Sequence, residues 1–118
     1  MIWAALALLA AAPSLDTVAA RMQSRWTPAC DTIERVTDLT AIVRLDRKGF
    51  VKGDIVIVDR RTGLQIDPAK PESASPGAIP AAERAKKAIL FGQPYGNLSP
   101  ELAGQAIKVD FSAQSACS

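Results

Sequence analysis

Residues 39–59, LTAIVRLDRKGFVKGDIVIVD, decide the fold, because they predict two strands joined by a tight turn. In the first half, every second side chain from Leu39 to Leu45 is apolar, which is the alternation of a strand with one buried face. The second half is rich in β-branched residues, which favour strands. The turn ends in Gly49, which can adopt positive φ, and Gly53 predicts a bulge in the returning strand. We therefore expect an antiparallel hairpin.

Helical patterns flank this hairpin on both sides. Before it, apolar side chains recur at the spacing of one helix face over residues 15–26, with Ser14 or Asp16 as the N-cap. After it, the segment PAAERAKKAILFG, residues 80–92, alternates apolar and charged side chains, and Pro80 suits the first position of a helix. The inward side of this second helix is expected to consist of Ala81, Ala82, Ala85, Ala88 and Ile89.

A long loop and a third strand complete the chain. Residues 60–79 are rich in proline, which disfavours helices and interior strands, so an extended loop is predicted there. Beyond the second helix, Ser99 and Pro100 predict one further helical turn. Residues 106–111, AIKVDF, alternate as a strand, and the tail after them is expected to be loose unless Cys117 holds it.

The order of these elements is helix, strand, strand, long loop, helix, strand. It predicts an α+β fold, a small three-stranded antiparallel sheet with two helices packed on one face. If the second helix recrosses the sheet, the third strand runs antiparallel to the first. The simplest arrangement then places the first strand in the middle and the third strand at an edge.

Composition argues against several classes of function. At 118 residues, with 48% hydrophobic and 22% charged residues, the chain suits one globular domain. The net charge of +2 comes from interspersed charges and aromatic residues make up 5%, so no nucleic-acid surface is expected. The sequence contains no histidine, the commonest metal ligand and the side chain that titrates near neutral pH. We expect no metal, no cofactor and no small-molecule substrate.

An enzyme would have to use Asp, Glu, Ser, Lys or Tyr alone. Asp46, Asp54 and Asp59 lie on the hairpin but suit solvent-facing or turn positions, and Tyr95 lies in a predicted turn. No spacing predicts that such groups converge in a pocket. A small hydrolase is therefore the least favoured of the functions considered, and we expect no catalysis.

An unbroken apolar run, IWAALALLAAA, occupies residues 2–12. It is shorter than the roughly 20 residues of a membrane-spanning helix but has the length of a signal-peptide core. The alternative is a buried amino-terminal helix, since alanine and leucine favour helices. We favour a signal peptide over residues 1–14, which leaves a domain at residues 15–118 and predicts export to the periplasm.

The two cysteines, Cys30 and Cys117, stand near opposite ends of this expected domain. In an oxidising periplasm such a pair tends to form a disulfide, whereas in the cytosol it would stay reduced. The alternative is two unpaired thiols, with Cys117 in a frayed tail.

Several segments in this order resemble the C-terminal domain shared by TolA and TonB, and more closely the TolA branch of α-proteobacteria. No single motif carries the likeness; the ordered set does, and it spans nearly the whole expected domain. The segments are RMQSRWTP (21–28), IVRLDRKG (42–49), IVIVD (55–59), AAERA (81–85), LSP (98–100) and IKVDF (107–111).

The resemblance implies a periplasmic protein-interaction domain associated with envelope integrity or energy transduction. In that family the edge strand of the sheet accepts an extended segment of a partner, so that unpaired backbone N–H and C=O groups become paired. The implied partners are proteins of the cell envelope, and the membrane is involved only through export or through a partner. In this sequence the edge strand consists of Ile107, Lys108, Val109, Asp110 and Phe111.

Two features depart from the family pattern. TolA and TonB proper have a membrane-spanning anchor and a long spacer, whereas the apolar run here is shorter and no spacer follows it. The Pro-rich loop from Asp67 to Pro80 is also longer than the family's usual link into its second helix. We therefore expect an orphan binding domain or an accessory partner instead of an energy transducer. The alternative is a secreted inhibitor-like or adhesin-like module that uses the 60–79 loop.

Overall fold

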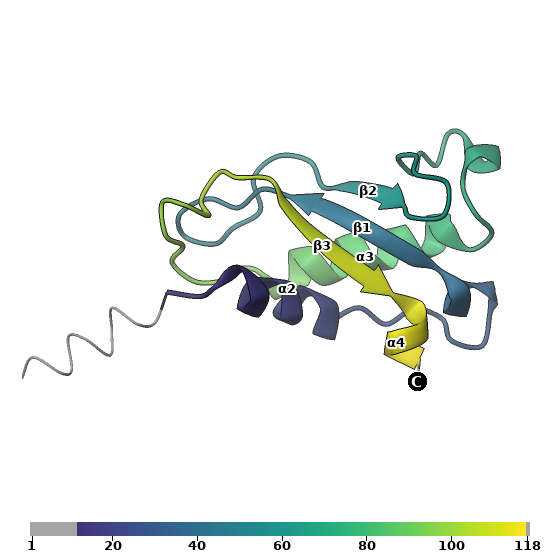
Figure 1. Ribbon diagram of the computed structural model, residues 1–118, viewed down its shortest axis with the longest axis horizontal. Helices are drawn as coiled ribbons and strands as arrows, with labels where there is room; N and C mark the ends of the chain where they lie inside the picture. Colours follow the sequence, from purple (N-terminus) through teal and green to yellow (C-terminus); the bar gives the residue numbers. More distant parts are fainter. Residues whose placement is uncertain (1–11, 118) are drawn as a thin grey trace, which may run out of the picture.

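A computed structural model describes residues 12–117 of the chain. Its centre is a three-stranded antiparallel sheet in the order β2-β1-β3. The strands span Asp38–Val43 in β1, Val56–Asp59 in β2 and Ile107–Ser112 in β3. Figure 1 shows β1 between its two neighbours, with β3 on the side that faces the amino-terminal helix. The predicted α+β fold, with the first strand in the middle and the third antiparallel at an edge, is confirmed.

Two longer helices pack on one face of the sheet, as predicted. Helix α2 (Leu15–Ser24) contacts β3, and helix α3 (Ala78–Gly92) crosses behind the sheet in Figure 1. Ser14 is the N-cap of α2, because its hydroxyl accepts a hydrogen bond of 3.2 Å from the Thr17 N–H. The predicted signal peptide falls outside the described residues except for its last three positions.

The hairpin forms with the predicted bulge. Ile42 is paired with Val56, whereas the next bridge joins Leu45 to Val51, so the returning chain carries extra residues between the two pairs. Gly53 lies in this segment with φ of 73°. A bulge of this kind interrupts the pairing, which is why β2 is shorter than the returning half of the predicted hairpin.

The tip of the hairpin is fixed by backbone contacts that require glycine. Gly49 has φ of 87°, and its carbonyl accepts a hydrogen bond of 2.9 Å from the Tyr95 N–H. A Cβ atom at Gly49 would lie 2.6 Å from the backbone nitrogen of Gly96, which is closer than real contacts allow. The turn predicted from DRKG is therefore also a docking point for the loop after α3.

The core lies between the sheet and the two longer helices. Trp26 joins them, because its indole N–H donates to the Ala81 carbonyl at 3.1 Å and its ring meets Phe111 edge to face at 5.3 Å between centroids. All five residues predicted for the inward side of the second helix are buried. The other large buried hydrophobic side chains are Val18, Met22, Leu39, Val43, Leu45, Ile57, Ile66, Tyr95, Leu98, Ile107 and Val109.

Helix α3 begins two residues earlier than predicted. Gly77, with φ of 82°, precedes its first turn, and Pro80 is the third helical residue instead of the first. Proline is tolerated there because the first four N–H groups of a helix have no partner within the helix. Gly92 is the last helical residue. Differences of one or two residues are usual at helix ends, because the end turns fray.

Three short helices were not predicted. They are η1 (Ile33–Val36), η2 (Pro71–Ser73) and α4 (Ala113–Cys117). Each is too short for a helical hydrophobic pattern to appear in the sequence. Helix α4 follows β3 directly and contacts η1, so the described part of the tail, residues 113–117, is helical and held at Cys117. The helical turn predicted at Ser99 is present, since the Ser99 carbonyl accepts from the N–H groups of Leu102 and Ala103.

The 60–79 loop is attached to the sheet through Asp59, which lies at the start of a turn, one of the two positions predicted for it, but is buried instead of solvent-facing. Asp59 is 1% exposed, and its carboxylate accepts hydrogen bonds from the Arg61 N–H at 2.9 Å and the Ser75 N–H at 2.7 Å. Burial raises the pKa of Asp59, but the hydrogen bonds from Ser75, Arg61 and Thr62 together lower it by more than burial raises it. The pKa therefore lies below its ordinary value of 3.8. The sequence pattern did not show this because the partners lie up to 16 residues away.

We expect Asp59→Ala to lower the free energy of unfolding by about 1–3 kcal/mol, because it leaves buried N–H groups without an acceptor. Since the pKa of Asp59 is lower in the folded state, its stabilisation is full above the unfolded pKa and is lost as the pH falls through the folded pKa. Urea unfolding of both proteins at a series of pH values checks this. Asp59→Asn, which keeps one acceptor oxygen, is the matched control and should lose less. A stability difference that stays constant below pH 3.8 would contradict the assignment.

Candidate functional site

The two edges of the sheet differ in how they are covered. Beyond β2, residues 64–66 run alongside the strand, where the Asp59 N–H donates to the Leu64 carbonyl at 3.0 Å and the Ile66 N–H donates to the Ile57 carbonyl at 2.9 Å. Beyond β3, no further strand is present within residues 12–117. The chain itself therefore covers one edge and leaves the other available.

The register shows which backbone groups of β3 face outward. The Ala113 N–H donates to the Thr37 carbonyl at 2.9 Å, so the pair of Ala113 with Thr37 is hydrogen-bonded. In an antiparallel pair such residues alternate, and Phe111, Val109 and Ile107 therefore direct their N–H and C=O groups toward β1. Of the five residues predicted for the edge, Lys108 and Asp110 direct theirs away from the sheet.

One outward group of β3 already has a partner, which the sequence did not reveal. The side-chain amide of Gln23, on α2, donates a hydrogen bond of 2.7 Å to the Asp110 carbonyl. The N–H groups of Lys108 and Asp110 have no hydrogen-bond partner in the described part of the chain. Gln23 lies on the exposed side of its helix, and no sequence pattern could have linked it to a strand 87 residues later.

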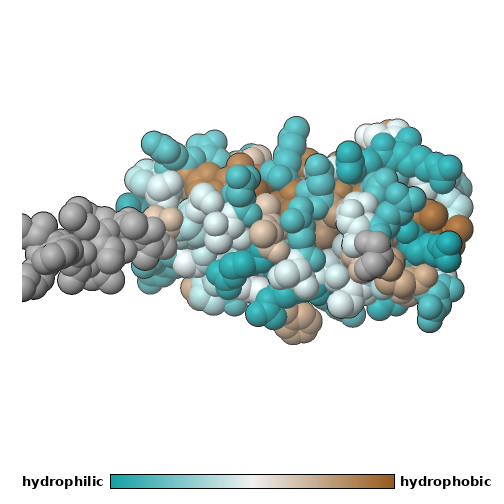
Figure 2. Space-filling model, turned by 60° about the horizontal axis from the view of Figure 1, so that its bottom comes forward, coloured by the Kyte–Doolittle hydropathy of each residue, from teal (hydrophilic) through white to brown (hydrophobic). Residues whose placement is uncertain are grey.

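A groove runs along the carboxyl-terminal half of this edge. It has a volume of about 510 Å³ and lies between α2, the end of β3 and α4. Figure 2, which brings this side of the molecule forward, shows hydrophilic side chains with hydrophobic ones only in small areas between them. The groove is lined by Ala20, Gln23, Ser24, Trp26, Asp110, Phe111, Ser112, Ser115 and Ala116.

The side chains of β3 alternate between the core and the solvent. Ile107, Val109 and Phe111 are buried, as predicted, whereas Lys108 and Asp110 are exposed on the open face of the sheet. The Thr40 hydroxyl donates to a carboxylate oxygen of Asp110 at 2.8 Å. The Lys108 ammonium has no ion-pair or hydrogen-bond partner among residues 12–117. This strand therefore presents one free positive and one partly engaged negative charge two residues apart.

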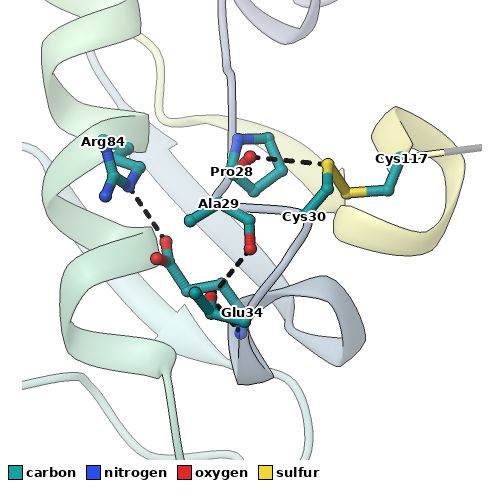
Figure 3. Close-up of a disulfide and its surroundings, with 7 residues drawn as sticks. Pro28, Ala29, Cys30, Glu34, Arg84 and Cys117 are labelled. Carbon is teal, nitrogen blue, oxygen red and sulfur yellow. Dashed lines mark hydrogen bonds and ion pairs between the residues drawn. A yellow bond between two sulfur atoms is a disulfide. The ribbon is translucent and has the colours of Figure 1, made fainter.

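The two cysteines form a disulfide, which decides between the two alternatives left by the sequence. Cys30 and Cys117 are joined with a Cα–Cα distance of 5.6 Å, and Figure 3 shows the bond between the segment after α2 and the end of α4. Close by, the buried carboxylate of Glu34 accepts a hydrogen bond of 3.1 Å from Arg84 on α3. The disulfide therefore holds α4 at the end of the groove.

The side chains considered for catalysis, Asp46, Asp54 and Tyr95, lie in separate environments. One Asp46 oxygen accepts hydrogen bonds from the N–H groups of Lys48 and Phe50, each at 2.9 Å, and so closes the hairpin turn. Asp54 is exposed. The Tyr95 hydroxyl is buried and donates to the Ile89 carbonyl at 2.6 Å. Within residues 12–117, no group of three or more His, Cys, Asp or Glu side chains could hold a metal ion.

No family model, no curated protein and no solved structure matches this chain. The TolA/TonB resemblance therefore stays a prediction from the ordered segments. Among the described helices, none is long and apolar enough to cross a membrane. Together, fold and site define a class: a small, disulfide-bonded α+β domain whose sheet is covered at one edge and open at the other.

Proposed function

We propose that this chain is an exported protein-interaction domain that binds a partner polypeptide by adding a strand to the outer edge of β3. The single observation that supports it most is the asymmetry of the sheet, because residues 64–66 cover β2 whereas Lys108 and Asp110 turn free N–H groups outward. An incoming strand gains affinity from such groups and specificity from neighbouring pockets. This is binding without catalysis.

The partner belongs to the cell envelope, and the domain acts in the periplasm. Three observations support this part of the proposal. The disulfide suits an oxidising compartment, the apolar run at residues 2–12 suits a signal peptide, and the ordered sequence segments resemble the TolA/TonB C-terminal domain. In that setting the domain contributes to envelope integrity or to an energy-transduction system as an accessory binding module.

Lys108→Pro tests the proposal. It removes an outward backbone donor, and proline is tolerated on an edge strand when its nitrogen faces solvent. The purified oxidised chain is immobilised and exposed to a periplasmic extract, and the recovered partner is quantified. We expect recovery to fall about tenfold or more, because a strand hydrogen bond is lost and the proline ring obstructs the edge.

Lys108→Ala is the matched control, since it removes the same side chain but keeps the N–H. It should recover as much partner as the wild type. Proline at Val109 is the less suitable change, because that N–H faces β1 and the variant would damage the sheet itself. Equal recovery by wild type and Lys108→Pro, with circular dichroism showing both folded, would reject strand addition.

The second candidate is the inhibitor-like or adhesin-like module. One observation favours it: the segment that contains η2 protrudes beyond the sheet in Figure 1 and is tied at both ends to Asp59. Replacing residues 68–73 with a short Gly-Ser linker leaves these ties in place. Loss of partner recovery in this variant, with full recovery by Lys108→Pro, would favour the loop over the edge.

A further inference from the structure

The open edge of β3 is complementary to a second copy of itself. A strand that pairs with the Ile107–Phe111 part of β3 must place its own outward-facing residues opposite Lys108 and Asp110, because within that segment those two residues direct their backbone groups away from β1. In an antiparallel arrangement, the best partner has a basic residue opposite Asp110 and, two positions later, an acidic residue opposite Lys108. Apolar residues must alternate with these charges.

The segment Ile107–Phe111, IKVDF, has this pattern. It runs apolar, basic, apolar, acidic, apolar, which is the order required of the partner. We propose that two copies of this chain associate through antiparallel pairing of their β3 edges, with Lys108 of each copy opposite Asp110 of the other. The inference rests on the same open edge as the proposed function. It adds that a second copy of the chain occupies this edge when no other partner is bound.

Charge distinguishes the three registers that are centred on Lys108, Val109 and Asp110. With the symmetry axis at Val109, Lys108 and Asp110 of one copy form hydrogen-bonded pairs with Asp110 and Lys108 of the other. With the axis at Lys108, two lysines face each other, and with the axis at Asp110, two aspartates do. Like charges directly opposite each other destabilise a sheet, so the register centred on Val109 is favoured.

This register also satisfies every outward backbone group of the two residues. Lys108 and Asp110 each exchange both an N–H and a C=O bond with the second copy, so the free donors found on the edge acquire acceptors. Gln23 must release the Asp110 carbonyl, and as an exposed side chain it then bonds to water. The Thr40–Asp110 hydrogen bond does not interfere, because it uses a side-chain oxygen.

Charge reversal tests the pairing on the purified oxidised chain. Sedimentation equilibrium from micromolar to millimolar concentration gives the dissociation constant of the dimer. Lys108→Asp places two aspartates opposite each other twice, and Asp110→Lys does the same with lysines. We expect either single reversal to raise the dissociation constant about fivefold or more, and the double reversal K108D/D110K to restore it, because opposite charges face each other again.

Thermal unfolding of each variant checks that the monomer is intact, and Lys108→Asp is the cleaner single change because that side chain has no partner in the described structure. Hydrogen exchange at the Lys108 and Asp110 amides should slow as concentration rises. A wild type that is monomeric at millimolar concentration, or a double reversal that fails to restore association, would overturn the inference. If Lys108→Pro still lowers the recovery of the partner protein in that case, the proposed function remains supported although the dimer is rejected.

Discussion

Removal of the Cys30–Cys117 disulfide is expected to lower the free energy of unfolding by about 4 kcal/mol. The bond joins residues 87 apart in sequence, and closing so long a loop removes much of the entropy of the unfolded chain. The chain-entropy relation gives about 4–5 kcal/mol for such a loop, and small domains commonly lose about 2–5 kcal/mol when a native disulfide is removed. Domains of this size have roughly 5–15 kcal/mol in total, so the fraction lost is large.

Urea and thermal unfolding of the oxidised chain, the reduced chain and a C30S/C117S variant measure this effect. The melting temperature should fall by roughly 15–30 °C, since about 1 kcal/mol corresponds to 4–8 °C in a domain of this size. The reduced wild type and the double variant should agree, because both lack the bond. Intact mass after alkylation, with and without reductant, confirms the oxidation state. A loss below about 1 kcal/mol would mean that the unfolded chain is already constrained.

Trp26→Ala is expected to have the next largest effect, a loss of about 3–5 kcal/mol. The indole is 4% exposed and lies where α2, α3 and β3 meet, in contact with Phe111 and the Ala81 carbonyl. Truncation removes the packing of a large ring and leaves a cavity that the surrounding alanines cannot fill. Trp26 also lines the groove beside the edge, so the change should weaken partner binding.

Trp26→Phe is the matched control. It keeps an aromatic ring against Phe111 but lacks the indole N–H, so its loss should be smaller, near the net value of about 1 kcal/mol for a hydrogen bond plus the smaller ring. Equilibrium unfolding followed by far-ultraviolet circular dichroism reports both variants, since tryptophan fluorescence changes with the mutation itself. If Ala and Phe at this position were equally stable, the ring would not be part of the core.

Much of the fold could be predicted from local patterns. These patterns depend only on neighbours within a few residues of the chain. They are the alternation from Leu39 to Leu45, the glycines at positions 49 and 53, and the inward alanines of α3. Periodicity of this kind decides which face of a strand or helix is apolar, and burial follows. The boundaries of α3 and the short helices were missed because tertiary packing decides them.

The candidate site was predicted in part. The order of the elements predicted that the strand made of Ile107, Lys108, Val109, Asp110 and Phe111 lies at an edge, and the resemblance added its partner-binding role as an expectation. The sequence could not determine which of them turn their backbone groups outward, because that depends on the pairing with β1. It also gave no sign of Gln23, since the contact joins a helix and a strand far apart in the chain.

The features that the sequence determined and those that the tertiary structure decided have different physical causes. By itself, the sequence determined the periodicity of apolar side chains, and with it the α+β class, the faces that are buried and the number of strands. Tertiary structure alone decided the pairing phase of β3, the burial of Asp59 beneath the 60–79 loop, and the coverage of the β2 edge by residues 64–66. Hydrogen-bond direction and long-range contact depend on how elements meet in space, and side-chain order along the chain does not encode them locally.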